Sequence, residues 1–115
     1  MRRLLSSLTA ALVLLSLAPA ISQAGTTRSC ARVVNPYPGT RYEGADLARI
    51  RATDVTCATA RRVARSAHRR ALSLPVAAGP VRRFTWNGWR VTGDLRGSRD
   101  TYVAGKGDAR VRWIF

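Results

Sequence analysis

The segment DVTCATARRVARSAHRRA (residues 54–71) gathers most of the side chains in this chain that could do chemistry. It holds a cysteine, the only histidine and a run of arginines, with a single acid at its edge. Guanidinium groups recognise phosphate and carboxylate groups, and an imidazole can exchange protons near neutral pH. The segment is therefore either a helix that grips a polyanion or the basic outer face of an ordinary packed helix.

The spacing of small apolar residues predicts an amphipathic helix that runs to about Arg70. Asp54 or Thr56 can cap its N-terminus. One side should pack against a sheet, because apolar residues recur there at intervals of three and four: Cys57, Ala60, Val63, Ala64, Ala67 and Ala71. The other side carries a candidate polyanion contact: Arg61, Arg62, Arg65 and Arg69.

His68 is the only possible imidazole base. Near the C-terminal end of the helix, a cationic His68 beside Arg69 and Arg70 would suit the helix dipole. Hydroxyl groups for a serine-type site are available, without the nucleophile elbow that such a site needs: Ser66, Ser73 and Ser98. The candidate catalytic carboxylates fall in loops, where aspartate forms local hydrogen bonds: Asp94, Asp100 and Asp108. The sequence therefore predicts no enzyme and no cofactor.

Cys30 and Cys57 are the only cysteines. An even cysteine count in an exported chain favours a disulfide, which would stabilise the fold by about 3.5 kcal/mol. Two cysteines and one histidine fall one ligand short of a structural zinc site. We expect a disulfide between these cysteines and no metal site.

The first residues have the layout of a secretory signal peptide. Arg2 and Arg3 precede an apolar run from Leu8 to Leu17, and small residues follow as far as Ala24. A membrane anchor, the alternative, needs roughly 20 apolar residues, and this run is shorter. We expect residues 1–24 to be a signal peptide, residues 25–115 to form a single domain, and the protein to be secreted.

The chain is strongly basic, with a formal net charge of +14, and arginine supplies all but one of the 20 basic residues. This bias can reflect GC-rich coding as much as function. Phe84, Trp86, Trp89 and Trp113 lie among arginines and could stack nucleic-acid bases, but strand alternation predicts the same pattern for a core. An extracellular protein or an anionic envelope polymer is a possible partner, whereas nucleic acid is not expected outside the cell.

Two function classes fit these observations. The first is a secreted, non-catalytic binding or interaction domain, such as a protein ligand or inhibitor. The second is a cationic, antimicrobial-like protein that associates with the cell envelope or with membranes. Binding in the second class should fall steeply with salt, whereas the first class predicts one saturable partner.

Strand signals lie on both sides of the helix. Residues 25–29 are polar and are expected to be loose. Strands are predicted at 30–35, at 47–55 with Ala48, Ile50 and Ala52 on one face, at 81–92, at 101–105 and at 109–115. The order β-β-α-β-β-β predicts an α+β fold with one helix packed on a small antiparallel sheet.

Segment 81–92 has two interpretations. Asn87-Gly88 is a hairpin signal that would pair Trp86 with Trp89. The alternative is one long strand with a bulge at Gly88.

Three short motifs resemble those of a loose group of small exported proteins from GC-rich Gram-positive bacteria, most of them uncharacterised: RATDVTCATARRVAR, GWRV and GDARVRWIF. The resemblance implies a secreted α+β domain and no particular activity. It favours the bulge at Gly88. The group usually carries four cysteines in two bridges. Because the second pair falls near Val91 and Val103, the resemblance implies that these valines lie side by side.

Overall fold

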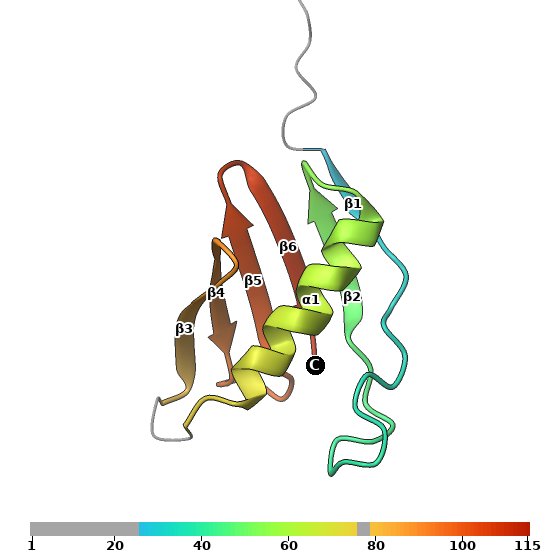
Figure 1. The fold of residues 1–115 in the computed structure, drawn as a ribbon, viewed down its shortest axis with the longest axis vertical. Coiled ribbons are helices and arrows are strands. Elements are labelled where there is room, and N and C mark those ends of the chain that lie inside the picture. The colour runs from blue at the N-terminus through green and yellow to red at the C-terminus, as the bar shows by residue number, and fades with distance from the viewer. Residues whose placement is uncertain (1–25, 76–78) are drawn as a thin grey trace, which may run out of the picture.

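The described part of the chain, residues 26–75 and 79–115 of this computed structural model, folds into six strands and one helix. The predicted signal peptide lies outside these residues. The elements are β1 (Thr27–Ser29), β2 (Ala48–Thr53), α1 (Cys57–Leu72), β3 (Val81–Trp86), β4 (Trp89–Asp94), β5 (Thr101–Lys106) and β6 (Ala109–Ile114). The strands form one antiparallel sheet in the order β1-β2-β6-β5-β4-β3, and α1 crosses one face of it (Figure 1). The predicted α+β class is thus confirmed, with one strand more than expected.

The core fills the space between α1 and the sheet. A row of cross-strand neighbours points toward the helix: Ala52, Val111, Ala104, Val91 and Phe84. The predicted apolar side of the helix meets them, and all its members except the half-buried Cys57 are buried. Most of these helix residues are alanines, so the helix can lie close to the sheet.

Thr56 rather than Asp54 caps the helix. Its side chain accepts a hydrogen bond of 3.2 Å from the backbone N–H of Thr59. This satisfies one of the N–H groups that have no partner within the helix. At the other end, the helix continues to Leu72, slightly beyond the predicted end at Arg70.

The prediction of a bulge at Gly88, which the resemblance favours, is wrong. Strands β3 and β4 form a hairpin in which Trp86 pairs with Trp89. Asn87 and Gly88 have φ values of 45° and 79°. Positive φ at both central residues is what a two-residue type I′ turn requires, and its twist matches that of the strands.

The strand predicted at 30–35 is displaced toward the N-terminus. The segment expected to be loose supplies β1, which pairs with residues 51–53 of β2, and only an isolated bridge from Val33 to Leu47 follows. Within residues 30–35, two backbone carbonyls accept hydrogen bonds from the Arg61 side chain, that of Ala31 at 3.1 Å and that of Arg32 at 3.3 Å. These carbonyls are therefore not used to extend the ladder with β2.

Val91 and Val103 do not lie side by side, contrary to what the resemblance implied. Val91 pairs with Ala104, and Val103 pairs with Thr92. A register difference of one residue places two side chains on opposite faces of a sheet. Val91 therefore faces the helix and Val103 faces away from it.

A glycine in β4 makes room for the buried ring of Tyr102. A Cβ atom at Gly93 would lie 2.4 Å from Cε1 of Tyr102. The Tyr102 ring cannot easily move away, because it is buried and stacks on Trp113 with ring centroids 5.3 Å apart.

Gly93→Ala is therefore expected to lower the free energy of unfolding by about 2 kcal/mol through overpacking. Chemical denaturation measures the change. Gly97→Ala, in the loop after β4, is the matched control, because a Cβ atom there would come no closer than 3.5 Å to a neighbour. Equal effects of the two substitutions would contradict this account of Gly93.

Candidate functional site

Arginines gather on the sheet face opposite the helix. Strand alternation directs the residues between the core positions to this face, and in five positions that residue is an exposed arginine: Arg51, Arg83, Arg90, Arg110 and Arg112. They come from four strands, β2, β3, β4 and β6, that are far apart in sequence. The sheet therefore assembles one basic surface from separate segments.

The central strand β5 carries no charge on this face. Val103 pairs with Arg112 on β6, and Gly105 lies between Arg110 on β6 and Arg90 on β4. Strands β4 and β6 are two strand spacings apart, about 10 Å. We use the name arginine trough for five residues around β5. Val103 and Gly105 form its floor, and Arg90, Arg110 and Arg112 form its sides.

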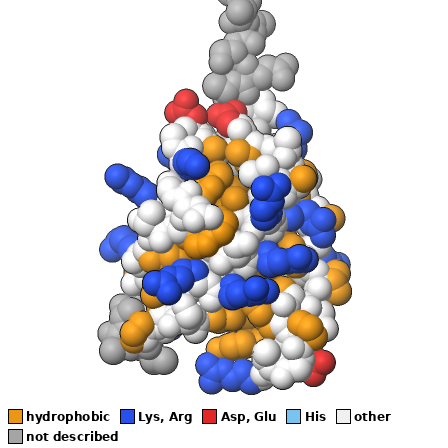
Figure 2. Space-filling view, viewed as in Figure 1, with side chains coloured by type: hydrophobic (Ala, Val, Ile, Leu, Met, Phe, Trp, Pro, Cys, Tyr) orange, Lys and Arg blue, Asp and Glu red, His pale blue; other side chains and the backbone are white. Residues whose placement is uncertain are grey.

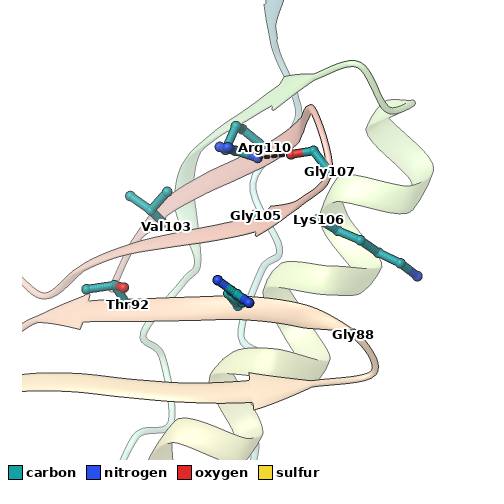
Figure 3. Close-up of a pocket in the computed structure, with 8 residues that line it drawn as sticks. Gly88, Thr92, Val103, Gly105, Lys106, Gly107 and Arg110 are labelled. Atoms are coloured by element: carbon teal, nitrogen blue, oxygen red, sulfur yellow. Dashed lines mark hydrogen bonds between the residues drawn. The ribbon is translucent and has the colours of Figure 1, made fainter.

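A groove of about 470 Å³ occupies much of this trough, and Figure 3 shows Thr92, Val103 and Gly105 along it, with Arg110 beside Gly107. Its lining also includes Lys106, at the end of β5. Two smaller hollows lie on the same face, of about 200 Å³ beside Arg51 and Arg112 and of about 320 Å³ beside Arg83 and Arg90. The sheet face opposite the helix thus carries shallow grooves that are lined by cationic side chains.

Arg110 is held in place over the trough floor. Its Nη1 atom donates to the carbonyls of Gly107 at 2.6 Å and Ala109 at 2.7 Å. A Cβ atom at Gly105 would lie 3.0 Å from that same nitrogen, so glycine lets the guanidinium lie flat on the strand. A side chain that is already ordered loses less entropy when it binds an anion.

The trough carries its positive charge without acidic partners. The two ion pairs within residues 26–75 and 79–115 are Arg32–Asp46 and Arg96–Asp94, and neither involves a trough residue. Arg51 and Arg112 even lie directly opposite each other on β2 and β6, where like charges destabilise a sheet. This surface therefore attracts anions at some expense of stability.

Asp94 is the acid at the end of β4, and its charge is already neutralised. Arg96 donates to both of its carboxylate oxygens, at 2.8 and 3.0 Å. These hydrogen bonds lower the pKa of Asp94 to about 2. Asp94 therefore stays ionised and paired, and it contributes little negative potential to the neighbouring trough.

The candidate polyanion contact on the helix is only partly available. Arg62, Arg65 and Arg69 are exposed. Arg61 is partly buried and binds backbone carbonyls, so it has a structural role. These helix arginines lie on the helix-covered side of the sheet, which is the side seen in Figure 2, and the trough lies on the other side.

His68 is not the cationic residue that the helix dipole suggested. Its side chain is fully buried, and Nδ1 shares a hydrogen bond of 2.5 Å with the Tyr37 hydroxyl. Its ring also packs against Phe115, with centroids 4.2 Å apart. Burial lowers the pKa of His68 to about 4 and raises that of Tyr37 to about 12, because a charged ring would lose its hydration. The imidazole is neutral at physiological pH.

The hydroxyl and carboxyl groups considered for catalysis do not reach this imidazole. Nε2 of His68 has no hydrogen-bond partner among the described residues. The Ser73 hydroxyl donates to the carbonyl of Arg70 at 2.7 Å, and the backbone of Asp100 pairs with that of Phe115. Within the described ranges, no group of histidine, cysteine and acidic side chains could hold a metal ion, and no helix is long and apolar enough to cross a membrane.

The trough was not predicted from the sequence, although part of its pattern was visible there. Arg49 with Arg51, and Arg110 with Arg112, alternate with apolar residues in two separate segments. The sequence does not reveal that β2 is the neighbour of β6, or that the uncharged β5 lies between β6 and β4. Repeated Arg-x-Arg spacing in two strands is the signal that points to such a face.

The disulfide predicted between Cys30 and Cys57 is present, with Cα atoms 5.4 Å apart. It joins the residue after β1 to the first turn of α1. No protein-family model, curated protein or solved structure matches the chain. The resemblance to small exported Gram-positive proteins therefore stays a prediction.

Proposed function

We propose that the protein is a secreted, non-catalytic domain that binds an anionic polymer of the cell envelope through the arginine trough. The observation that carries this proposal is the arrangement of Arg90, Arg110 and Arg112 on both sides of an uncharged strand. Flat guanidinium groups on opposite sides of a groove can each donate paired hydrogen bonds to phosphate or carboxylate groups.

The dimensions of the trough suit an extended chain. Arg110 and Arg112 are two residues apart on β6, so their Cα atoms are separated by about 7 Å. A polymer lying along β5 could therefore meet one guanidinium after another on the β6 side and Arg90 on the β4 side. Poly(glycerol phosphate), a chain of phosphodiesters, has the chemistry that such a row of arginines would recognise.

Three further observations support this proposal. The disulfide is typical of proteins that reach an oxidising compartment. The only imidazole is sealed in the core and cannot exchange protons with a substrate. The proposal also explains why Arg51 and Arg112 lie opposite each other, because a bound anion would relieve their repulsion.

Reversing the charge on both sides of the trough should weaken binding strongly and leave the fold intact. Arg90→Glu with Arg112→Glu is expected to weaken binding to fluorescent poly(glycerol phosphate) at least about tenfold more than a matched control, since each charge-assisted hydrogen bond contributes about 1.5–3 kcal/mol. The control is Arg41→Glu with Arg99→Glu, two exposed loop positions with the same change in net charge. Anisotropy gives the affinity, and the melting temperature is recorded alongside.

Wild-type affinity should also fall about 20-fold when salt rises from about 50 to about 200 mM, given about three anion contacts on a flexible chain, one for each trough arginine. Equal losses in the two double variants would mean that only net charge matters. A single saturable protein partner with weak salt dependence would favour the interaction-domain class over the polymer.

A further inference from the structure

The outer side of α1 forms a second basic surface. Arg62, Arg65 and Arg69 are exposed and occur at intervals of three and four, so they project to one side of the helix. We name them the arginine ridge. The helix sequence CATARRVARSAHRRAL contains no acid, and Figure 2 shows Lys and Arg side chains spread over this face of the molecule.

The ridge and the trough face opposite directions. The helix packs on the sheet face that carries Ala52, Ala104 and Val111, all fully buried. Trough residues alternate with these core residues along the same strands, so they project from the other face. An extended chain in the trough would have to turn around the edge of the sheet to reach the ridge. The two surfaces are therefore separate sites.

We propose that the domain cross-links two chains of the same anionic polymer, one in the trough and one on the ridge. This inference rests on the proposed function of the trough. Charge complementarity selects the occupant of the ridge, because its exposed arginines have no ion-pair partner within the described residues. The sheet, the core and the helix separate the two chains by more than the Debye length, about 8 Å at physiological salt. Repulsion between the chains is therefore largely screened by salt.

The test measures cross-linking and binding separately. Wild-type protein is titrated into poly(glycerol phosphate) chains while light scattering is followed, and affinity is measured on a sparsely coated poly(glycerol phosphate) surface. Wild type should give a scattering maximum at an intermediate ratio that disappears when either component is in excess. For the ridge variant, Arg62→Glu with Arg65→Glu, the height of this maximum should fall about tenfold. Its affinity for the coated surface should stay within about threefold of wild type, because only the link between two chains is lost.

The loop variant, Arg41→Glu with Arg99→Glu, has the same net charge as the ridge variant and should scatter like wild type. Scattering that falls equally in both variants would show that aggregation follows net charge and would overturn the inference. A ridge variant that still cross-links would also overturn it, while leaving the trough proposal intact. Wild type that fails to bind the coated surface would instead refute the proposed function.

Discussion

Replacing Cys30 and Cys57 together by serine is expected to lower the free energy of unfolding by about 3.5 kcal/mol. The bridge closes a sequence separation of 27 residues, and a loop of that length restricts the unfolded chain by this amount in the chain-entropy model. For a domain of this size the change is a large share of the total stability. Urea unfolding of the oxidised wild type and of the double variant measures the difference.

The loss of stability should be largest at the edge of the sheet that β1 forms. Strand β1 pairs with β2 over only three residues, and Cys30 follows it directly. Hydrogen exchange of the β1 amides should therefore accelerate more than that of β5. Reduced wild type should behave like the double variant. A change in unfolding free energy below about 1 kcal/mol would contradict this prediction, and it would mean that the unfolded chain retains structure without the bridge or that the bridge strains the folded protein.

Acidification is expected to destabilise the domain by about 3 kcal/mol between pH 6.5 and pH 4, through His68. Burial lowers the folded pKa from 6.5 to about 4. In this pH window the unfolded chain binds a proton that the folded protein excludes, so stability falls as the pH falls. Each unit of pKa difference corresponds to about 1.4 kcal/mol. Below pH 4 both states are protonated, and this contribution has been lost completely.

His68→Gln should flatten the dependence of the unfolding free energy on pH between about 6.5 and 4. Other groups also change the unfolding free energy in or below this pH range. Hydrogen bonding lowers the pKa values of Asp46 and Asp94, so their contributions are lost at more acidic pH, and burial raises the pKa of Asp100, which acts in the opposite sense. An NMR titration of the wild-type imidazole is independent of whether the variant folds. A midpoint near 6.5 would contradict the buried, neutral His68.

Much of the fold could be predicted because it depends on neighbours along the chain. The alternation in ARVRW sends arginine and apolar residues to opposite faces of any strand that forms there. In ARIRAT the same alternation holds from Ile50 onward, whereas a register shift between Ala48 and Arg51 interrupts it at the start of the strand. The intervals of three and four in the helix place its alanines on one side for the same geometric reason. The chain holds two cysteines, so each had only the other as a possible disulfide partner. These conclusions required no knowledge of which segments meet.

The tertiary structure alone decided which strands are neighbours, and with them the trough. Pairing β2 with β6 brings Arg51 opposite Arg112, and placing the uncharged β5 between β6 and β4 opens the groove. No local periodicity encodes that order, because it depends on which sheet edges bury the most apolar surface together. His68 is a similar case. Its position near the C-terminal end of the helix could be predicted, but its neutral state depends on Tyr37 and Phe115, which lie far away in sequence and pack against its ring.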